Sequence, residues 1–131
     1  MANKVKMVFD NQYHGIVTGH HGSSQVGPTE GALSAYDMVL GGLGACLNHT
    51  FQTVVDKKKL QFQAIKYTIV GEKREEVPTT LKHVLVEAVV TGVDETKQAQ
   101  IKKAFELATR YCSVYQTISH VAEMEWRVVF N

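Results

Sequence analysis

The sequence predicts an α+β protein whose strands pair in antiparallel sheets. Short segments in which apolar and polar residues alternate indicate strands. These segments come in groups, as in hairpins, instead of alternating one by one with helices. Two longer segments have the apolar pattern of helices. A chain of 131 residues is long enough for a real core, and a single domain over residues 1–131 is expected.

Three short strands are expected at the start of the chain. The first covers residues 4–9, where apolar side chains recur with the period of a half-buried strand. Turn-forming residues follow at 10–12 and again at 19–24. The second and third strands are therefore expected at residues 14–18 and 24–26.

A long helix is predicted over residues 34–58. Ser34 suits the N-cap, and Asp37 stands three residues later, near the acidic position of a capping box. From residue 35 to 47 the helix is apolar on every face, which predicts burial on every face. Three glycines in this stretch each cost about 1 kcal/mol relative to alanine, so a closely approaching helix, which a partner subunit could supply, is expected to offset them. These glycines are Gly41, Gly42 and Gly44.

The rest of the chain is predicted to form three strands and two helices. Strands are expected at residues 62–72, 80–91 and 121–130, each with apolar side chains on one face. Asp94 caps a helix that continues to about residue 110, and a shorter helix is expected at 114–119. The apolar stripe of the longer helix consists of Ile101, Ala104, Phe105 and Ala108.

Charge and composition exclude several classes of protein. A net charge of +1 provides no field to attract nucleic acid or an anionic membrane, so neither is expected as a partner. The first residues lack the apolar segment of a signal peptide. The longest apolar run is shorter than the roughly 18 residues that a membrane span needs. A cytoplasmic protein is therefore expected. In that compartment the only two cysteines, Cys46 and Cys112, are better explained as free or catalytic thiols than as a structural disulfide.

Each cysteine lies in a recognisable motif. Residues 34–46, Ser-Ala-Tyr-Asp-Met-Val-Leu-Gly-Gly-Leu-Gly-Ala-Cys, are similar to the pattern Ser-Pro-x-Glu-Leu-Leu-Leu-Ala-Ala-Leu-Gly-Ala-Cys. Residues 111–118, Tyr-Cys-Ser-Val-Tyr-Gln-Thr-Ile, are similar to Tyr-Cys-Pro-Val-His-x-Thr-Leu. Both patterns are those of the OsmC/Ohr family of osmotically induced and organic-hydroperoxide-resistance proteins. The chain resembles this family over nearly all of its length, including residues 56–60 and 92–94.

The resemblance implies an intertwined homodimer in which antiparallel sheets wrap around two long central helices. It also implies a thiol-dependent peroxidase that reduces organic hydroperoxides in oxidative-stress defence. By position, Cys46 is the peroxidatic cysteine and Cys112 the resolving cysteine. A dithiol reductant would regenerate the pair, and no cofactor or metal is implied.

The chain departs from the family pattern where the family activates its cysteine. The active peroxidases use an arginine from the early strands and a glutamate ten residues before the cysteine. Here no arginine precedes Arg74, and Tyr36 stands at the place of the glutamate. Asp37, nine residues before Cys46, matches the acidic residue of a more divergent OsmC-like branch. The residues that could activate Cys46 instead are His20, His21 and His49.

Several alternatives stay open at this point. Asp37 can serve as a capping residue or as a site residue. The pair His20-His21 can be a solvated turn. Cys46, His49 and Cys112 could supply metal ligands, although no second closely spaced pair completes a metal site. The second function hypothesis is a non-catalytic small-molecule binding or stress protein with the same fold.

Overall fold

The structure is a computed structural model that describes residues 2–131. Its contacts divide the chain into two compact units, one ending at Val39 and the other covering Leu40–Asn131. Each unit is described by itself below. The prediction of a single domain stays a prediction.

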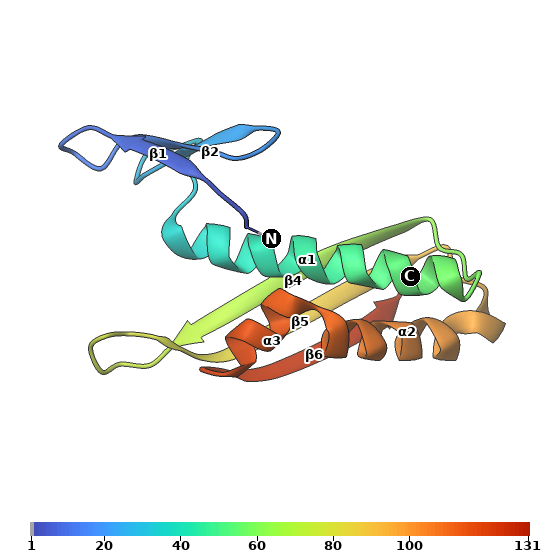
Figure 1. Cartoon of the computed structure of the whole chain (residues 1–131). Coiled ribbons are helices and arrows are strands. Elements are labelled where there is room, and N and C mark those ends of the chain that lie inside the picture. Colours follow the sequence, from blue (N-terminus) through green and yellow to red (C-terminus); the bar gives the residue numbers. More distant parts are fainter. Residues whose placement is uncertain (1) are drawn as a thin grey trace. The chain divides into compact units, whose positions relative to one another are not determined.

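The first unit contains a three-stranded antiparallel sheet. Its strands are β1 (Lys6–Phe9), β2 (Gly15–Thr18) and β3 (Ser23–Val26), in the order β1-β2-β3 (Figure 1). All three strands agree with the sequence prediction to within two residues at either end. Every residue of β1 is exposed, so this strand buries little within the chain.

A long helix, α1 (Ala35–Lys57), begins in the first unit and belongs to the second from Leu40 onward. Ser34 and Asp37 form the predicted capping box: the Ser34 amide donates to Asp37 Oδ2 at 2.8 Å and the Asp37 amide donates to Ser34 Oγ at 3.1 Å. These two bonds satisfy backbone donors that a helix start otherwise leaves unpaired.

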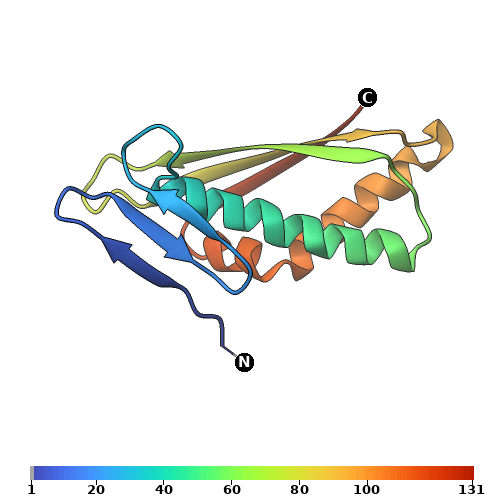
Figure 2. The same ribbon diagram turned by 90° about the horizontal axis from the view of Figure 1, so that it is seen from above.

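The second unit packs helices on one face of a three-stranded sheet. The sheet has the order β4-β5-β6, with β4 (Ala64–Lys73), β5 (Leu81–Thr91) and β6 (Glu123–Phe130). Its helices are the second-unit part of α1, α2 (Gln98–Tyr111) and α3 (Ser113–Ser119), and Figures 1 and 2 show them covering the same side of the sheet. A short 3₁₀ turn, Glu95–Lys97, with Asp94 as its cap, leads into α2.

The core lies between these helices and the sheet. Along β5 every second residue is buried, which confirms the predicted inward face. The predicted stripe of α2 is likewise fully buried. The core residues contributed by these three elements are Leu43, Leu47, Phe51 and Val55 of α1, Val84, Val86, Ala88 and Val90 of β5, and Ile101, Ala104, Phe105 and Ala108 of α2.

The α+β class is confirmed, but one strand pair differs from the expected antiparallel arrangement. β4 and β5 are antiparallel, whereas β5 and β6 run parallel, with His83 opposite Glu123 and Val90 opposite Phe130. A parallel pair requires a long crossover, and here the crossover contains α2 and α3. Alternation of apolar residues reports burial of one face and carries no information on strand direction, which is why the sequence did not reveal it.

Burial on every face of α1 is not observed within one chain. The buried residues of the helix form a single stripe at intervals of four, while Gly41, Gly42 and Ala45 are exposed. A methyl group added at Gly41 or Gly42 would meet no atom within 4 Å, whereas one at Gly44 would approach Ile69 Cδ1 at 3.0 Å. Close packing against a neighbouring side chain therefore explains the glycine at position 44, but not those at positions 41 and 42.

Candidate functional site

The two cysteines lie together in the second unit. Cys46 comes from α1 and is half-buried. Cys112 lies in the one-residue break between α2 and α3 and is fully buried. Both are free thiols, and each contributes to the pKa shift of the other.

The local conformation of Cys112 explains this position. Its backbone is extended, with φ −73° and ψ 114°, so it ends α2 and acts as the N-cap of α3. Its amide donates to the Ala108 carbonyl at 2.8 Å, and its sulfur accepts a bond from the Tyr115 amide at 3.4 Å. The thiol thus takes the place of the oxygen that usually caps a helix, and the chain turns so that the next residues face Cys46.

Several uncharged donors surround the sulfur of Cys46. The Ser113 hydroxyl lies 3.8 Å from Cys46 Sγ. Burial acts to raise the pKa of the Cys46 thiol. Hydrogen bonds from the backbone of Val114, from the Cys112 thiol and from both the hydroxyl and the backbone of Ser113 outweigh burial. As a result, the pKa of Cys46 lies below the ordinary value of a thiol, which favours the thiolate.

The second thiol has the opposite character. Burial, followed by the hydrogen bond and the charge of Cys46, raises the pKa of Cys112 to about 11, although the Tyr115 amide opposes this change. Cys112 is therefore protonated at neutral pH and can donate its hydrogen to the Cys46 thiolate. The pair consists of one sulfur that ionises readily and one that does not.

Two tyrosines complete the surroundings of the thiol pair. Tyr67 on β4 donates from its hydroxyl to Asn48 Oδ1 on α1 at 3.0 Å. Burial, and then the charge of Cys112, raises the pKa of Tyr67, and the same two causes raise that of Tyr115. Both side chains therefore stay neutral beside the sulfurs.

Sequence reasoning did not assign site roles to Ser113, Asn48 or Tyr67. Ser113 stands next to a motif cysteine, and Tyr67 lies in the strand expected at residues 62–72. These sequence positions could have indicated the two residues, but neither position predicts which side-chain atom lies near which sulfur.

The remaining residues predicted for the site lie as follows. The Asp37 carboxylate accepts the capping bond from Ser34, which agrees with its capping interpretation. His20 and His21 lie in the turn between β2 and β3, with their rings edge to face and their centroids 4.2 Å apart. His49 is exposed on α1, and its carbonyl accepts a bond from the Thr53 hydroxyl. The structure leaves the activating roles of these four residues as predictions.

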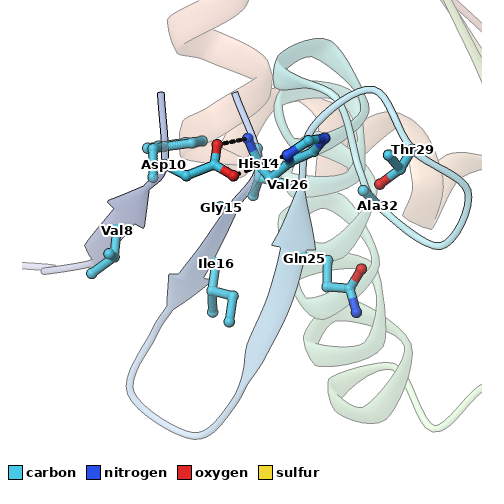
Figure 3. A pocket seen from close by; sticks show the side chains of 10 residues that line it. Val8, Asp10, His14, Gly15, Ile16, Gln25, Val26, Thr29 and Ala32 are labelled. Carbon is cyan, nitrogen blue, oxygen red and sulfur yellow. Dashed lines mark hydrogen bonds and ion pairs between the residues drawn. The ribbon is translucent and has the colours of Figure 1, made fainter. Parts of the chain in front are cut away.

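A separate pocket of about 480 Å³ lies in the first unit and contains no cysteine. Figure 3 shows Asp10 and His14 on its wall, joined by an ion pair of 3.0 Å. Hydrogen bonds from the His14 and Gln12 amides, followed by the His14 side chain, lower the pKa of Asp10 to about 2. Asp10 thus organises the turn between β1 and β2. The lining residues are Val8, Phe9, Asp10, His14, Gly15, Ile16, Gln25, Val26, Thr29 and Ala32.

Residues 2–131 lack two further kinds of feature. No group of three or more histidine, cysteine or acidic side chains in that range could hold a metal ion. No helix in the same range combines the length and apolarity that crossing a membrane requires.

The chain belongs to the OsmC-like protein family, whose family model matches residues 27–127. This family and its fold agree with the two cysteine motifs and with the two-layer arrangement of the second unit.

Individual relatives are more distant. The chain is 32% identical over 84 residues to Protein YhfA of Escherichia coli K12, a match that covers 63% of this chain and 62% of that protein. The chain therefore spans less than two thirds of the curated relatives that it matches. It is also similar to the structure of an OsmC-like protein from Mycoplasma pneumoniae, with a TM-score of 0.86 at 12% identity over 99% of this chain and 97% of that one. An organic hydroperoxide resistance protein, OsmC, from Legionella pneumophila has a TM-score of 0.75 at 14% identity over 98% and 97% of the two chains. At such identities these structures show the fold alone.

Proposed function

We propose that this protein is a thiol-dependent peroxidase that reduces organic hydroperoxides through Cys46 and Cys112. The observation that carries the proposal is the pair itself: the half-buried Cys46 thiol, whose pKa is lowered, lies beside the buried Cys112 thiol, whose pKa is raised. The family supports a role in stress defence, since the Legionella relative is described as an organic hydroperoxide resistance protein and a predicted redox protein. A cytoplasmic setting, where thiols remain reduced, suits two free cysteines.

In the first step the Cys46 thiolate attacks the outer oxygen of the hydroperoxide. A sulfur–oxygen bond forms, the oxygen–oxygen bond breaks, and the alkoxide leaves as the alcohol after taking a proton. Cys46 becomes a sulfenic acid, and the peroxide is reduced by two electrons.

In the second step the Cys112 thiolate attacks the sulfenic sulfur of Cys46. A disulfide forms, and the hydroxyl of the sulfenic acid leaves as water with one added proton. A dithiol reductant then exchanges with this disulfide, which restores both thiols and oxidises the reductant. Asp37, His20, His21 and His49 are proposed only as groups that orient or activate.

We propose further that the protein acts as an intertwined homodimer. Gly41, Gly42 and Ala45 leave a small, exposed apolar face on α1. Glycine inside a helix costs about 1 kcal/mol relative to alanine, and within residues 2–131 no atom lies within 4 Å of a Cβ added at Gly41 or Gly42 to offset that cost. The long helix of a second copy would fit against this face. Measurement of the solution mass by light scattering tests this proposal, and a monomer would contradict it.

The peroxidase proposal is tested by single-turnover oxidation. Pre-reduced protein is mixed with cumene hydroperoxide, and free thiols are counted before and after. The expected result is the loss of both thiols in each chain together with a disulfide between Cys46 and Cys112 in the mass spectrum. In Cys112→Ser the sulfenic acid on Cys46 should persist and react with dimedone, while Cys46→Ser should consume no peroxide.

If wild-type protein loses no thiol faster than Cys46→Ser, the peroxidase proposal is wrong. The second hypothesis, a non-catalytic small-molecule binding or stress protein, would then take its place. A search for an apolar molecule that purifies with the protein would follow.

A further inference from the structure

We infer that Ser113 is a catalytic residue of the Cys46 site, and that its hydroxyl donates a hydrogen bond to the Cys46 thiolate and stabilises it for attack. This inference rests on the proposed peroxidase function, because it assigns the donor that prepares the attacking sulfur. The neutral hydroxyl would take over the role of the early-strand arginine, since no arginine precedes Arg74 in this chain.

The geometry around Ser113 supports this assignment. Its Oγ lies 3.8 Å from Cys46 Sγ, a distance within the range of hydrogen bonds to sulfur. Among residues 2–131 its hydroxyl has no other hydrogen-bond partner, so no competing acceptor holds it away from the sulfur. Its own carbonyl accepts from the Thr117 hydroxyl at 2.8 Å, which ties the first turn of α3 together.

The side chain of Ser113 is exposed, but hydrogen bonds of the preceding residue hold its backbone in place. Cys112 is fixed by the bond from its amide to Ala108 and by the Tyr115 amide on its sulfur. Ser113 is the next residue and the first of α3, and its hydroxyl lies against Cys46. Its backbone also contributes to the lowered pKa of Cys46. A donor held in this way loses less rotational freedom when it binds the thiolate.

Three titratable side chains that interact with the sulfur pair have raised pKa values. Cys112 comes from the break between α2 and α3, Tyr67 from β4, and Tyr115 from α3. Burial, as the largest cause, raises the pKa of each of the three. None of these three groups therefore gains a negative charge in the pH range in which Cys46 ionises.

Three substitutions of Ser113 distinguish the effect of its hydroxyl from that of its amide hydrogen. Ser113→Thr keeps the hydroxyl, Ser113→Ala removes it, and Ser113→Pro removes both the hydroxyl and the amide hydrogen. Proline is compatible with the first position of a helix, and the extended backbone of Cys112 suits a residue before proline. The matched control is Ser119→Ala on the same helix, whose hydroxyl binds the Gln116 carbonyl at 2.6 Å.

The readout is the rate at which iodoacetamide alkylates Cys46 as a function of pH, with mass spectrometry to identify the modified cysteine. Hydrogen bonds to charged groups are stronger than those between neutral groups, and exposure of Ser113 weakens this one. Below the pKa of Cys46 we therefore expect alkylation to slow about threefold to tenfold in Ser113→Ala and further in Ser113→Pro. Ser113→Thr and Ser119→Ala should remain within about twofold of wild type.

At high pH the order should reverse. A thiolate of higher pKa is the stronger nucleophile, so Ser113→Ala should then react at least as fast as wild type. A structural defect would change the rate in the same direction at every pH. The inference is overturned if Ser113→Ala and Ser119→Ala give the same pH profile, or if Ser113→Thr behaves like Ser113→Ala.

Alkylation requires no peroxide, so the two proposals can fail separately. If wild type does not consume cumene hydroperoxide but Ser113→Ala still changes the profile, the peroxidase function is wrong and Ser113 remains the donor to the thiolate. If wild type consumes the peroxide and the profiles coincide, the function stands and the role of Ser113 is wrong.

Discussion

Raising the pH from 9 to 11 is expected to destabilise the protein through Cys112. The side chain is 0% exposed, and burial, followed by the neighbouring Cys46, raises its pKa from 9.0 to about 11. In the unfolded chain the thiol ionises near its ordinary value, so between these pH values the unfolded state releases a proton that the folded state keeps. The stability that Cys112 contributes is fully present below pH 9 and is lost as the pH rises through 11.

The size of the loss follows from the width of this interval. Each pH unit between the ordinary and the folded pKa is worth about 1.4 kcal/mol, so the free energy of unfolding falls by at most about 3 kcal/mol. This is a large part of the roughly 5–15 kcal/mol that stabilises a typical domain. Cys46 has the opposite sign: its folded pKa is lowered, so its contribution is present above the ordinary thiol value and is lost as the pH falls through the lowered one. The contribution of the two thiols to stability should therefore rise with pH from the lowered pKa of Cys46 to about 9 and fall above it.

Urea unfolding under reducing conditions measures this effect at a series of pH values and at one fixed protein concentration. Cys112→Ala should remove most of the alkaline loss, although the loss of packing and of the N-cap sulfur lowers its stability at every pH. The slope against pH is therefore the quantity to compare. Tyr67 and Tyr115 are present in both proteins, and burial is the largest cause of their raised pKa values. Their contributions to the slope therefore cancel to a first approximation when the two proteins are compared.

Cys46→Ala is the matched control. It should retain the alkaline loss, reduced in size, because burial is the largest cause of the raised pKa of Cys112 and does not depend on Cys46. Equal slopes above pH 9 in wild type and Cys112→Ala would show that the buried thiol is not the titrating group, and would refute the reasoning.

Two further predictions concern the packing that supports the site. Tyr67→Phe should lower the free energy of unfolding by about 1–2 kcal/mol, because Asn48 Oδ1 loses the hydroxyl donor that lies 3.0 Å away. Urea unfolding measures this loss. A change below about 0.3 kcal/mol would mean that water replaces the hydroxyl. Phe105→Ala should lower the free energy of unfolding by about 3–5 kcal/mol, because Phe105 is 0% exposed and its ring centroid lies 5.5 Å from that of Trp126 and 5.6 Å from that of Phe51. The control Val129→Ala, at a position 46% exposed, should lower it by less than about 1 kcal/mol. Similar losses for the two variants would contradict the placement of the core.

Most of the fold could be predicted from local patterns. The alternation in β5 and the stripe of α2 each report burial of one face, and a pattern of that kind lies in the sequence itself. The capping box of Ser34 and Asp37 is also local, because the two residues are only three apart. The parallel pairing of β5 with β6 could not be predicted in this way. It depends on how a crossover of two helices packs across the sheet, and that packing involves residues distant in sequence.

The site was predictable as a pair of cysteines but not as a set of contacts. The motifs predicted Cys46 and Cys112, and histidines were predicted to activate Cys46 because these residues can carry a positive charge. That prediction remains untested, and the structure places the hydroxyl of Ser113 against Cys46, 67 residues away in sequence. Whether a serine beside a cysteine faces the other thiol depends on the φ and ψ of Cys112, and no pattern of residue types specifies those angles.

The coupling of the two thiols sets the order of the proposed reaction. While Cys46 is a thiolate, its charge and hydrogen bond help to keep Cys112 protonated, so only one sulfur can attack the peroxide. Once Cys46 becomes a neutral sulfenic acid, that contribution disappears, and the pKa of Cys112 falls toward the value that burial alone imposes. Cys112 therefore becomes easier to ionise at the moment when its attack is needed. If this order is correct, disulfide formation after a single turnover should accelerate with pH in a range above that in which the first oxidation accelerates. Stopped-flow traces that show one common pH dependence for both steps would contradict it.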